Sequence, residues 1–288
     1  MKEIALKERE FEKLKRFPLD NIVSTESEIY YYKKNRKREC ILLKKIYHND
    51  YNTMHRKELT IENLEKSDLA NYEELVIPDS IVTICGIKTA FTIKEITDST
   101  NLHLFLINKR ISTKRKLEVL KKIGELLDKT QHQNQEFYFC DLQDYNFLVD
   151  KNDNVFVVDL DGSATNTNSP IISKYIALDD KTYGINKYKQ IVSGYVYPST
   201  DVDNFCYNTM ILNFLSQTSI GILSYEEYIE YLNYLLITEM INEDIYEILM
   251  NQYTNKYTES IGKYIDCIPE TTGRASYKVY KQLKKIPR

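Results

Sequence analysis

A change in the spacing of apolar residues near residue 100 limits the folds open to this chain more than any other feature. Residues 21–96 carry short apolar runs rich in Ile, Val, Thr and Tyr, a pattern typical of β-strands, with one helical stretch at 52–66. From Leu102 onward apolar residues recur at helical spacing, and the segment after Asp201 reads as helical throughout. The sequence therefore predicts a small sheet-rich part followed by a larger helical part.

The sheet-rich part is predicted to be a five-stranded antiparallel unit with one helix inserted after its third strand. Its strands are expected at residues 21–25, 29–34, 39–47, 81–85 and 90–96. A hairpin turn is expected at residues 35–38, and Gly86 lies between the last two strands. The charged segment at residues 1–17 is predicted to form a short amphipathic helix with Ile4, Phe11 and Leu14 facing inward.

The strongest helical signal is at residues 112–130. Its apolar residues Leu117, Leu120, Ile123 and Leu127 fall on one helical face, and Ser112 precedes them as the expected N-cap. Residues 164–200, by contrast, are polar and irregular, and a run of this length inside a compact domain is typically functional or disordered.

Charge and composition narrow the partners that we expect. The net charge of −3 gives no bulk attraction to nucleic acid or to an anionic membrane. No apolar stretch approaches the roughly 18–20 residues needed to cross a bilayer, and the first 17 residues lack the apolar centre of a secretory signal. Five cysteines are spread singly, which favours reduced thiols over disulfides or zinc. The protein is therefore expected to be cytoplasmic, with no nucleic-acid or membrane partner.

The residues with the clearest chemistry are at the edges of one predicted hairpin, in the sequence DLQDYNFLVDKNDNVFVVDLDGS. Asp141 precedes its first strand, Asn146 stands at the start of that strand, and Asp159 follows the second. These three side chains are expected to converge at one edge. The oxygens of Asn146 and Asp159 suit a hard cation such as Mg²⁺, which leaves Asp141 to orient or deprotonate a hydroxyl. Phosphoryl transfer needs this combination of positioning, charge neutralisation and one base.

The same residues resemble the catalytic motifs of the protein-kinase-like superfamily, which includes protein kinases and the aminoglycoside and choline kinases. The pattern D-x-x-x-x-N followed by an apolar run and Asp-Leu-Asp matches the catalytic loop and the metal-binding Asp of that superfamily. The resemblance implies that Asp141 is the catalytic Asp, Asn146 the loop Asn and Asp159 the metal-binding Asp. Asp161 then stands at the glycine position of the D-F-G motif.

The resemblance also implies a lysine on the third strand and a glutamate on the helix that follows it. Lys44 and Lys45 both fall on that strand, where only one of them can face a cleft, and the family pattern favours Lys44. Lys44 is expected to hold the nucleotide phosphates. Glu58 is the expected partner that orients it, with Glu62, four residues later on the same helical face, as the alternative.

Two further parts of the site follow from the resemblance alone. The adenine is expected to meet the backbone around Lys94, Glu95 and Ile96, after the fifth strand. The helix that begins near residue 200 is expected to start with a structural Asp, with Asp201 the better match and Asp203 the alternative.

The chain departs from the family pattern in the residues that are expected to contact the nucleotide phosphates. The loop that covers them is normally rich in glycine, yet the first glycine of the chain is Gly86, so the hydroxyls of Ser24 and Thr25 are the expected donors in its place. Gln143 stands where a Lys or His normally approaches the phosphate, and it can donate a hydrogen bond but carries no charge. Phe139 and Cys140 replace the usual pair before Asp141.

Taken together, the resemblance implies an α+β chain with a bilobal, protein-kinase-like fold. A helical extension is expected at residues 1–20, a small five-stranded lobe at 21–97 and a larger, mostly helical lobe at 98–288. The implied function is an ATP- and Mg²⁺-dependent phosphotransferase that acts on a protein or small-molecule hydroxyl. The alternative is a pseudokinase, in which the same fold senses nucleotide or binds protein without turnover.

Overall fold

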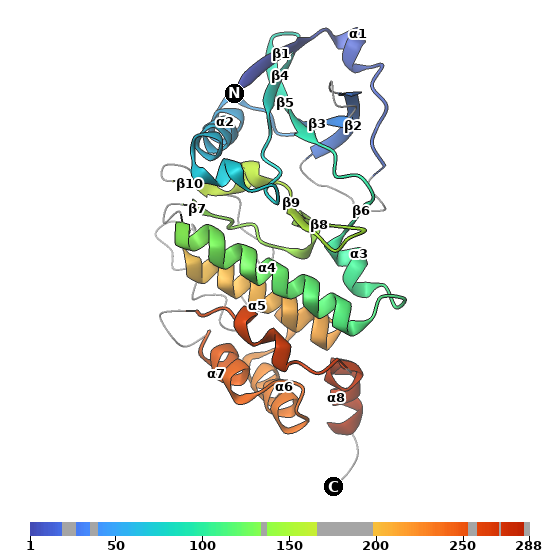
Figure 1. Ribbon diagram of the computed structural model, residues 1–288, viewed down its shortest axis with the longest axis vertical. Helices are drawn as coiled ribbons and strands as arrows, with labels where there is room; N and C mark the ends of the chain where they lie inside the picture. The colour runs from blue at the N-terminus through green and yellow to red at the C-terminus, as the bar shows by residue number, and fades with distance from the viewer. Residues whose placement is uncertain are drawn as a thin grey trace.

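The computed structural model describes residues 1–18, 27–34, 40–133, 137–165, 198–252, 258–270 and 272–284. It shows a mixed α/β protein in which a five-stranded, mostly antiparallel sheet lies at one end and helices lie at the other (Figure 1). The combination of a sheet-rich part with a helical part is therefore confirmed. The strand predicted at 21–25, the turn at 35–38 and most of the irregular segment at 164–200 lie outside the described residues.

The sheet has the strand order β1-β4-β5-β3-β2. Its strands are β1 (Lys2–Leu6), β2 (Ser27–Lys34), β3 (Cys40–Ile46), β4 (Ser80–Ile84) and β5 (Ile87–Lys94). Strands β2, β3, β5 and β4 pair antiparallel, whereas β1 pairs parallel to β4. Cys85 and Gly86, which both have a positive φ, form the tight turn between β4 and β5.

The helical extension predicted for residues 1–20 is wrong over its first part, because β1 is a strand of the sheet. The helix is limited to α1 (Glu8–Phe11). Ile4, Phe11 and Leu14 do pack against buried residues of the sheet, so the prediction that these side chains face inward is confirmed. The element type was wrong because the parallel partner of β1 is far away in sequence, and a strand's preference depends on its neighbours in the sheet.

Helix α2 (Tyr51–Lys66) follows β3 as predicted, and the side chain of Asp50 caps its first turn by accepting from the Thr53 N–H at 3.1 Å. One face of α2 packs on the sheet through an apolar cluster that includes Ile46 of β3. Since side chains alternate along a strand, Lys44 lies on the same face of β3 as Ile46 and therefore on the side of α2.

The predicted hairpin joins the sheet to the helices. Strand β8 (Phe147–Asp150) pairs antiparallel with β9 (Val155–Val157) and, on its other side, with β6 (Ser99–Asn101). Two short strands, β7 (Phe137–Tyr138) and β10 (Ala164–Thr165), pair just outside it. The 3₁₀ turns η2 (Asp144–Asn146) and η3 (Leu160–Gly162) stand at the start and the end of the hairpin.

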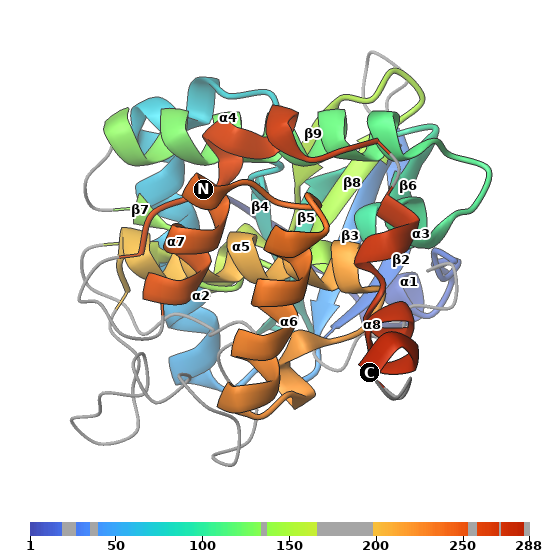
Figure 2. The same ribbon diagram turned by 90° about the horizontal axis from the view of Figure 1, so that it is seen from below.

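The helices form layers beneath the hairpin (Figure 1). They are α3 (Leu102–Ile107), α4 (Thr113–Gln133), α5 (Thr200–Ser216), α6 (Tyr225–Ile237), α7 (Glu243–Asn251) and α8 (Tyr277–Lys284). Among these helices, η5 (Ile220–Ile222) connects α5 to α6, and η6 (Gly262–Cys267) and η7 (Thr272–Ala275) lie between α7 and α8. The 3₁₀ segment η1 (Asp68–Asn71) leads from α2 to β4. Helices α4 and α5 lie side by side next to the hairpin, and α6, α7 and α8 lie beyond them (Figures 1 and 2).

Helix α4 confirms the strongest helical prediction. The Ser112 Oγ accepts from the Arg115 N–H at 3.3 Å, as expected for an N-cap. The four predicted apolar residues of α4 are buried in one large core that also contains the hairpin and the C-terminal helices. The hairpin edge is thereby held on a rigid support. No helix within the described ranges is both long enough and apolar enough to cross a bilayer.

Candidate active site

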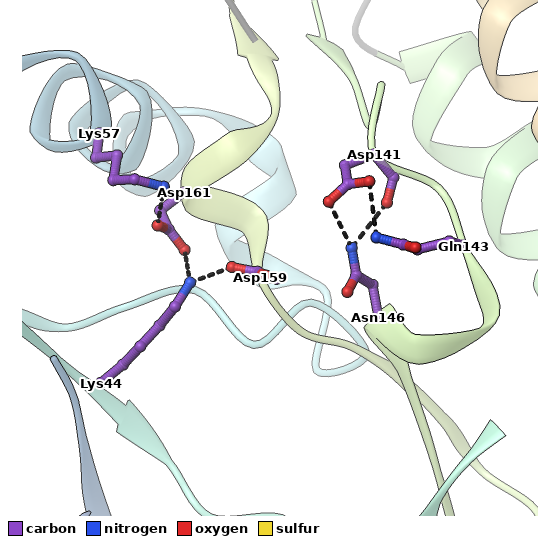
Figure 3. Close-up of polar contacts among 7 residues, drawn as sticks. All are labelled: Lys44, Lys57, Asp141, Gln143, Asn146, Asp159 and Asp161. Carbon is purple, nitrogen blue, oxygen red and sulfur yellow. Dashed lines mark hydrogen bonds and ion pairs between the residues drawn. The ribbon is translucent and has the colours of Figure 1, made fainter. Parts of the chain in front are cut away.

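Lys44 extends from β3 toward the end of the hairpin, where it meets two carboxylates (Figure 3). Its Nζ donates to Asp159 Oδ1 and, at 2.5 Å, to Asp161 Oδ1. Lys45 points to the other side of the sheet, where its Nζ lies 5.1 Å from the centre of the Phe11 ring. Of the two lysines left open by the sequence, Lys44 is therefore the one that faces the acidic edge.

Asp161 is held between two lysines. Its Oδ1 accepts from Lys44, and its Oδ2 accepts from Lys57 of α2 at 2.7 Å (Figure 3). Burial alone would raise the pKa of Asp161, but the ammonium groups of Lys44 and Lys57 lower it well below its usual range. Burial alone would likewise lower the pKa of Lys44, but the carboxylates of Asp159 and Asp161 raise it above its usual value. Asp161 and Lys44 are therefore both charged at neutral pH.

Asp159 is the more accessible of the two carboxylates, with 35% of its side chain exposed against 1% for Asp161. Its backbone adopts a left-handed conformation with φ of 68°, which turns the chain from β9 into η3. Asp is among the few side chains that adopt this conformation at low cost. The turn aims Asp159 at Lys44 and leaves it open to a ligand.

Asp141 and Asn146 are joined within one loop. The Asn146 Nδ2 donates to the Asp141 backbone carbonyl at 2.8 Å and to its Oδ2 at 2.9 Å, and the Gln143 Nε2 donates to Asp141 Oδ1 at 2.9 Å (Figure 3). These bonds fix the Asp141 carboxylate in one orientation. Because both protons on the amide nitrogen face Asp141, the oxygen of Asn146 points away from it.

The three predicted hairpin residues line one small pocket. Asp141, Asn146 and Asp159 all line it, together with apolar residues such as Leu142 and Phe147. The structure thus brings together the residues that the sequence placed at one edge, with Lys44 held to Asp159 on the side of the sheet. The carboxylate of Asp141 is held in one orientation, and that of Asp159 is paired with a lysine. This arrangement suits chemistry in which a hydroxyl is positioned next to a polyanion.

The donor set of this pocket fits Mg²⁺ in part. No group of three or more His, Cys, Asp or Glu side chains in the described part of the chain forms a preformed metal site. Asp159 and Asn146 supply one carboxylate and one amide oxygen, both hard donors. Mg²⁺ is commonly bound by one or two carboxylates while it keeps water and phosphate oxygens as its other ligands. These two residues therefore fit a metal that arrives together with a phosphate ligand.

Asp203 of α5 fixes the backbone just before Asp141. Its carboxylate accepts from the Phe139 N–H at 2.9 Å and from the Cys140 N–H at 2.8 Å. The expectation that favoured Asp201 is wrong, because Asp201 accepts instead from the Thr258 N–H at 2.5 Å. Asp203, two residues further along α5, is fully buried, and a polar side chain in such a place needs hydrogen-bond partners of its own.

Burial raises the pKa of Asp203 to about 7, although the two backbone N–H groups act in the opposite direction. An unfolded Asp loses its proton near pH 4. Between these two pH values the Asp203 carboxyl is protonated in the folded chain and ionised in the unfolded chain. The carboxyl therefore contributes stability at low pH that is lost as the pH rises through about 7.

Asp203→Asn should remove this pH dependence because the amide does not titrate. Relative to the unaltered chain, the free energy of unfolding of the variant is expected to rise by about 2–3 kcal/mol between pH 5 and pH 8. Urea unfolding of both proteins at the two pH values measures this difference. A difference that stays constant with pH would show that Asp203 does not titrate in this range.

Glu58 does not orient Lys44, and that prediction is wrong. Its carboxylate pairs with Lys88 of β5 at 2.5 Å, at the edge of α2. The alternative, Glu62, pairs with Lys66 of its own helix at 3.6 Å. Glu58 follows Lys57 directly, and consecutive residues on a helix point about 100° apart, so Lys57 faces the site while Glu58 faces the edge of the sheet.

The residues predicted to meet the adenine lie at the end of β5 and in the connection from β5 to β6. Lys94 is exposed at the end of β5. The Glu95 N–H donates to the Cys40 carbonyl at 3.0 Å, and the Ile96 carbonyl accepts from the Ser99 hydroxyl at 2.6 Å. These two backbone groups are thus engaged within the protein. Ser24 and Thr25, the predicted phosphate donors, lie outside the described residues.

Lys57 is the residue of this site that the sequence analysis missed. The signal was present, because Lys57 is three residues after Met54 and four before Ile61, on the buried face of α2. A lysine on such a face requires a buried acidic partner. Asp161, a second carboxylate at the end of the hairpin, was the matching signal.

The comparisons with known proteins do not assign this site. No model of a known protein family matches the chain, and no curated protein matches it in sequence. The geometry of the hairpin edge is therefore the basis of the functional proposal.

Proposed function

We propose that this chain is an ATP- and Mg²⁺-dependent phosphotransferase of the protein-kinase-like type. The observation that carries the proposal is that Lys44 from the sheet meets Asp159 at the hairpin end, and that Asp159 lines one pocket with Asp141 and Asn146. The sheet with α2 at one end and the helices at the other supports the bilobal fold implied by the resemblance.

Each residue has a distinct role in the proposed reaction. Lys44 leaves Asp159 and binds the phosphate oxygens of ATP, while the oxygens of Asp159 and Asn146 would hold Mg²⁺. When bound, the metal would neutralise charge on the phosphates. Asp141 orients the acceptor hydroxyl and takes its proton as the hydroxyl oxygen bonds to the γ-phosphorus and the bond to ADP breaks.

The loop around Asp141 supports this assignment. Gln143 and Asn146 hold the carboxylate by one oxygen each, so it has one orientation before any substrate binds. Proximity and orientation of this kind supply a large part of the rate in phosphoryl transfer. The acceptor is a hydroxyl of a protein or of a small molecule.

A second candidate is a pseudokinase that binds nucleotide or protein without turnover. The observation in its favour is that both oxygens of Asp141 already accept amide hydrogen bonds within the loop, and that the neighbouring Gln143 supplies no positive charge for the transition state. Such a loop positions a ligand well but accelerates a reaction less.

Thermal unfolding with and without ATP and Mg²⁺ tests the proposal first. Saturating ligand should stabilise the folded chain by RT ln(1 + [L]/Kd), which is about 2.7 kcal/mol at a hundred times Kd. No shift at millimolar ATP would contradict both candidates in their nucleotide-binding form. A shift accompanied by hydrolysis or transfer of the γ-phosphate supports the enzyme, whereas a shift without turnover supports the pseudokinase.

A further inference from the structure

Two lysines and two aspartates form a connected charge cluster at the end of the hairpin. Lys44 contacts both Asp159 and Asp161, and Lys57 contacts Asp161 alone (Figure 3). The side chains of Lys44 and Lys57 are each only 8% exposed, and that of Asp161 is 1% exposed. Groups as buried as these keep their charge only when oppositely charged partners are in contact.

The cluster is balanced because it holds two positive and two negative charges. Without Lys57, both carboxylates would depend on Lys44, and the site would carry one net negative charge next to the place where phosphates bind. At low effective dielectric one such charge acts strongly on a polyanion several ångströms away. Lys57 therefore offsets a carboxylate that would otherwise repel the ligand.

We propose that Lys57 is a positioning residue of the nucleotide site, which neutralises Asp161 and thereby keeps Lys44 available to the phosphates of ATP. This role rests on the proposed function. Lys57 itself stays on Asp161 and does not contact the nucleotide. Asp161 in turn would hold Lys44 in place when Asp159 binds the metal. Asp161, in η3, thus takes the role that was expected of Glu58, which is to orient Lys44.

The charge balance makes opposite predictions for the two partners. Lys57→Met leaves a net negative site and should weaken the affinity for ATP by about tenfold or more. Asp161→Asn leaves a net positive site and should preserve or tighten ATP binding while it lowers turnover, because Lys44 is less well held. The double variant restores the balance, and its affinity should return to within about threefold of the unaltered chain.

Isothermal titration with ATP, in Mg²⁺ and separately in a chelator, measures these affinities. Lys57→Arg keeps the positive charge and should bind ATP like the unaltered chain, whereas Lys57→Gln should bind as weakly as Lys57→Met. Glu58→Gln is the matched control, since Glu58 neighbours Lys57 on α2 but pairs with Lys88. Its affinity should stay within about twofold of the unaltered chain.

A merely structural role predicts another result. If Lys57→Met and Asp161→Asn weaken ATP binding by similar factors, and the double variant is weaker than either, the charge-balance role is overturned. Should the Met variant fail to fold, the contrast between Lys57→Arg and Lys57→Gln decides the question in the same way.

The failure of this role is distinguishable from failure of the proposed function. If the unaltered chain does not bind ATP, the proposed function falls, and the role of Lys57 in binding falls with it. If the unaltered chain binds ATP but both single variants weaken binding and the double variant weakens it further, only the role of Lys57 falls. A double-mutant cycle on the free energy of unfolding, in buffer alone, measures the Lys57–Asp161 ion pair without ligand. The double variant should lose less stability than the two single variants combined.

Discussion

Asp159→Asn is expected to lower Mg²⁺-dependent turnover of ATP by roughly a thousandfold. The change removes the only carboxylate assigned to the metal and also one of the two carboxylates that pair with Lys44. It should disturb the fold little, because Asn is the other side chain that readily adopts the left-handed backbone found at this position. Nucleotide binding in Mg²⁺ should weaken together with turnover. Steady-state release or transfer of the γ-phosphate measures the effect.

Asp153→Asn is the matched control for this variant. Asp153 lies in the turn of the same hairpin, also with a positive φ of 60°, and pairs with Arg115 rather than with any residue of the site. The same chemical change there should leave turnover within about twofold, since the pair has no contact with the residues of the site. Full activity in Asp159→Asn, or an equal loss in both variants, would show that Asp159 does not hold the metal.

Asp141→Asn should lower turnover by about a hundred- to ten-thousandfold while ATP affinity changes little. In the proposed reaction Asp141 acts on the acceptor hydroxyl and not on the nucleotide, so its loss removes the base but leaves Lys44, Asn146 and Asp159 in place. The amide that replaces it can still take part in hydrogen bonds with Gln143 or Asn146, which should preserve the loop. Turnover and titration with ATP separate the two effects.

The two variants are thus expected to differ in kind. Asp159→Asn loses binding and turnover together, whereas Asp141→Asn loses turnover alone. A pseudokinase would show binding in the unaltered chain but no turnover to lose. Equal turnover in the unaltered chain and in both variants would mean that the activity comes from elsewhere.

The parts of the fold that could be predicted from sequence are those with a strong local signal. Helix α4 has four apolar residues on one face and a serine cap, and both features are found in the structure. The hairpin that carries the site could be predicted because two short apolar runs flank a polar turn. Strand β1 could not be predicted, because Lys2–Leu6 becomes a strand only through pairing with Ser80–Ile84.

The candidate site shows the same division between local and non-local information. The spacing of Asp141, Asn146 and Asp159 along one hairpin is local, and these residues line one pocket. The residue of α2 that reaches the charge cluster depends on how α2 is rotated against the sheet, and this rotation places Lys57 rather than Glu58 toward the hairpin. Side chains of consecutive residues on a helix point about 100° apart. The sequence pattern did not distinguish which of Lys57 and Glu58 faces the hairpin.

A crystal structure of the chain with a non-hydrolysable ATP analogue and Mg²⁺ tests the central claim most directly. The account predicts that the phosphates contact the Lys44 ammonium, that the metal binds oxygens of Asp159 and Asn146, and that the ion pairs of Asp161 with Lys44 and Lys57 remain. An analogue bound on another surface, or bound without contact to Lys44 and Asp159, would contradict it.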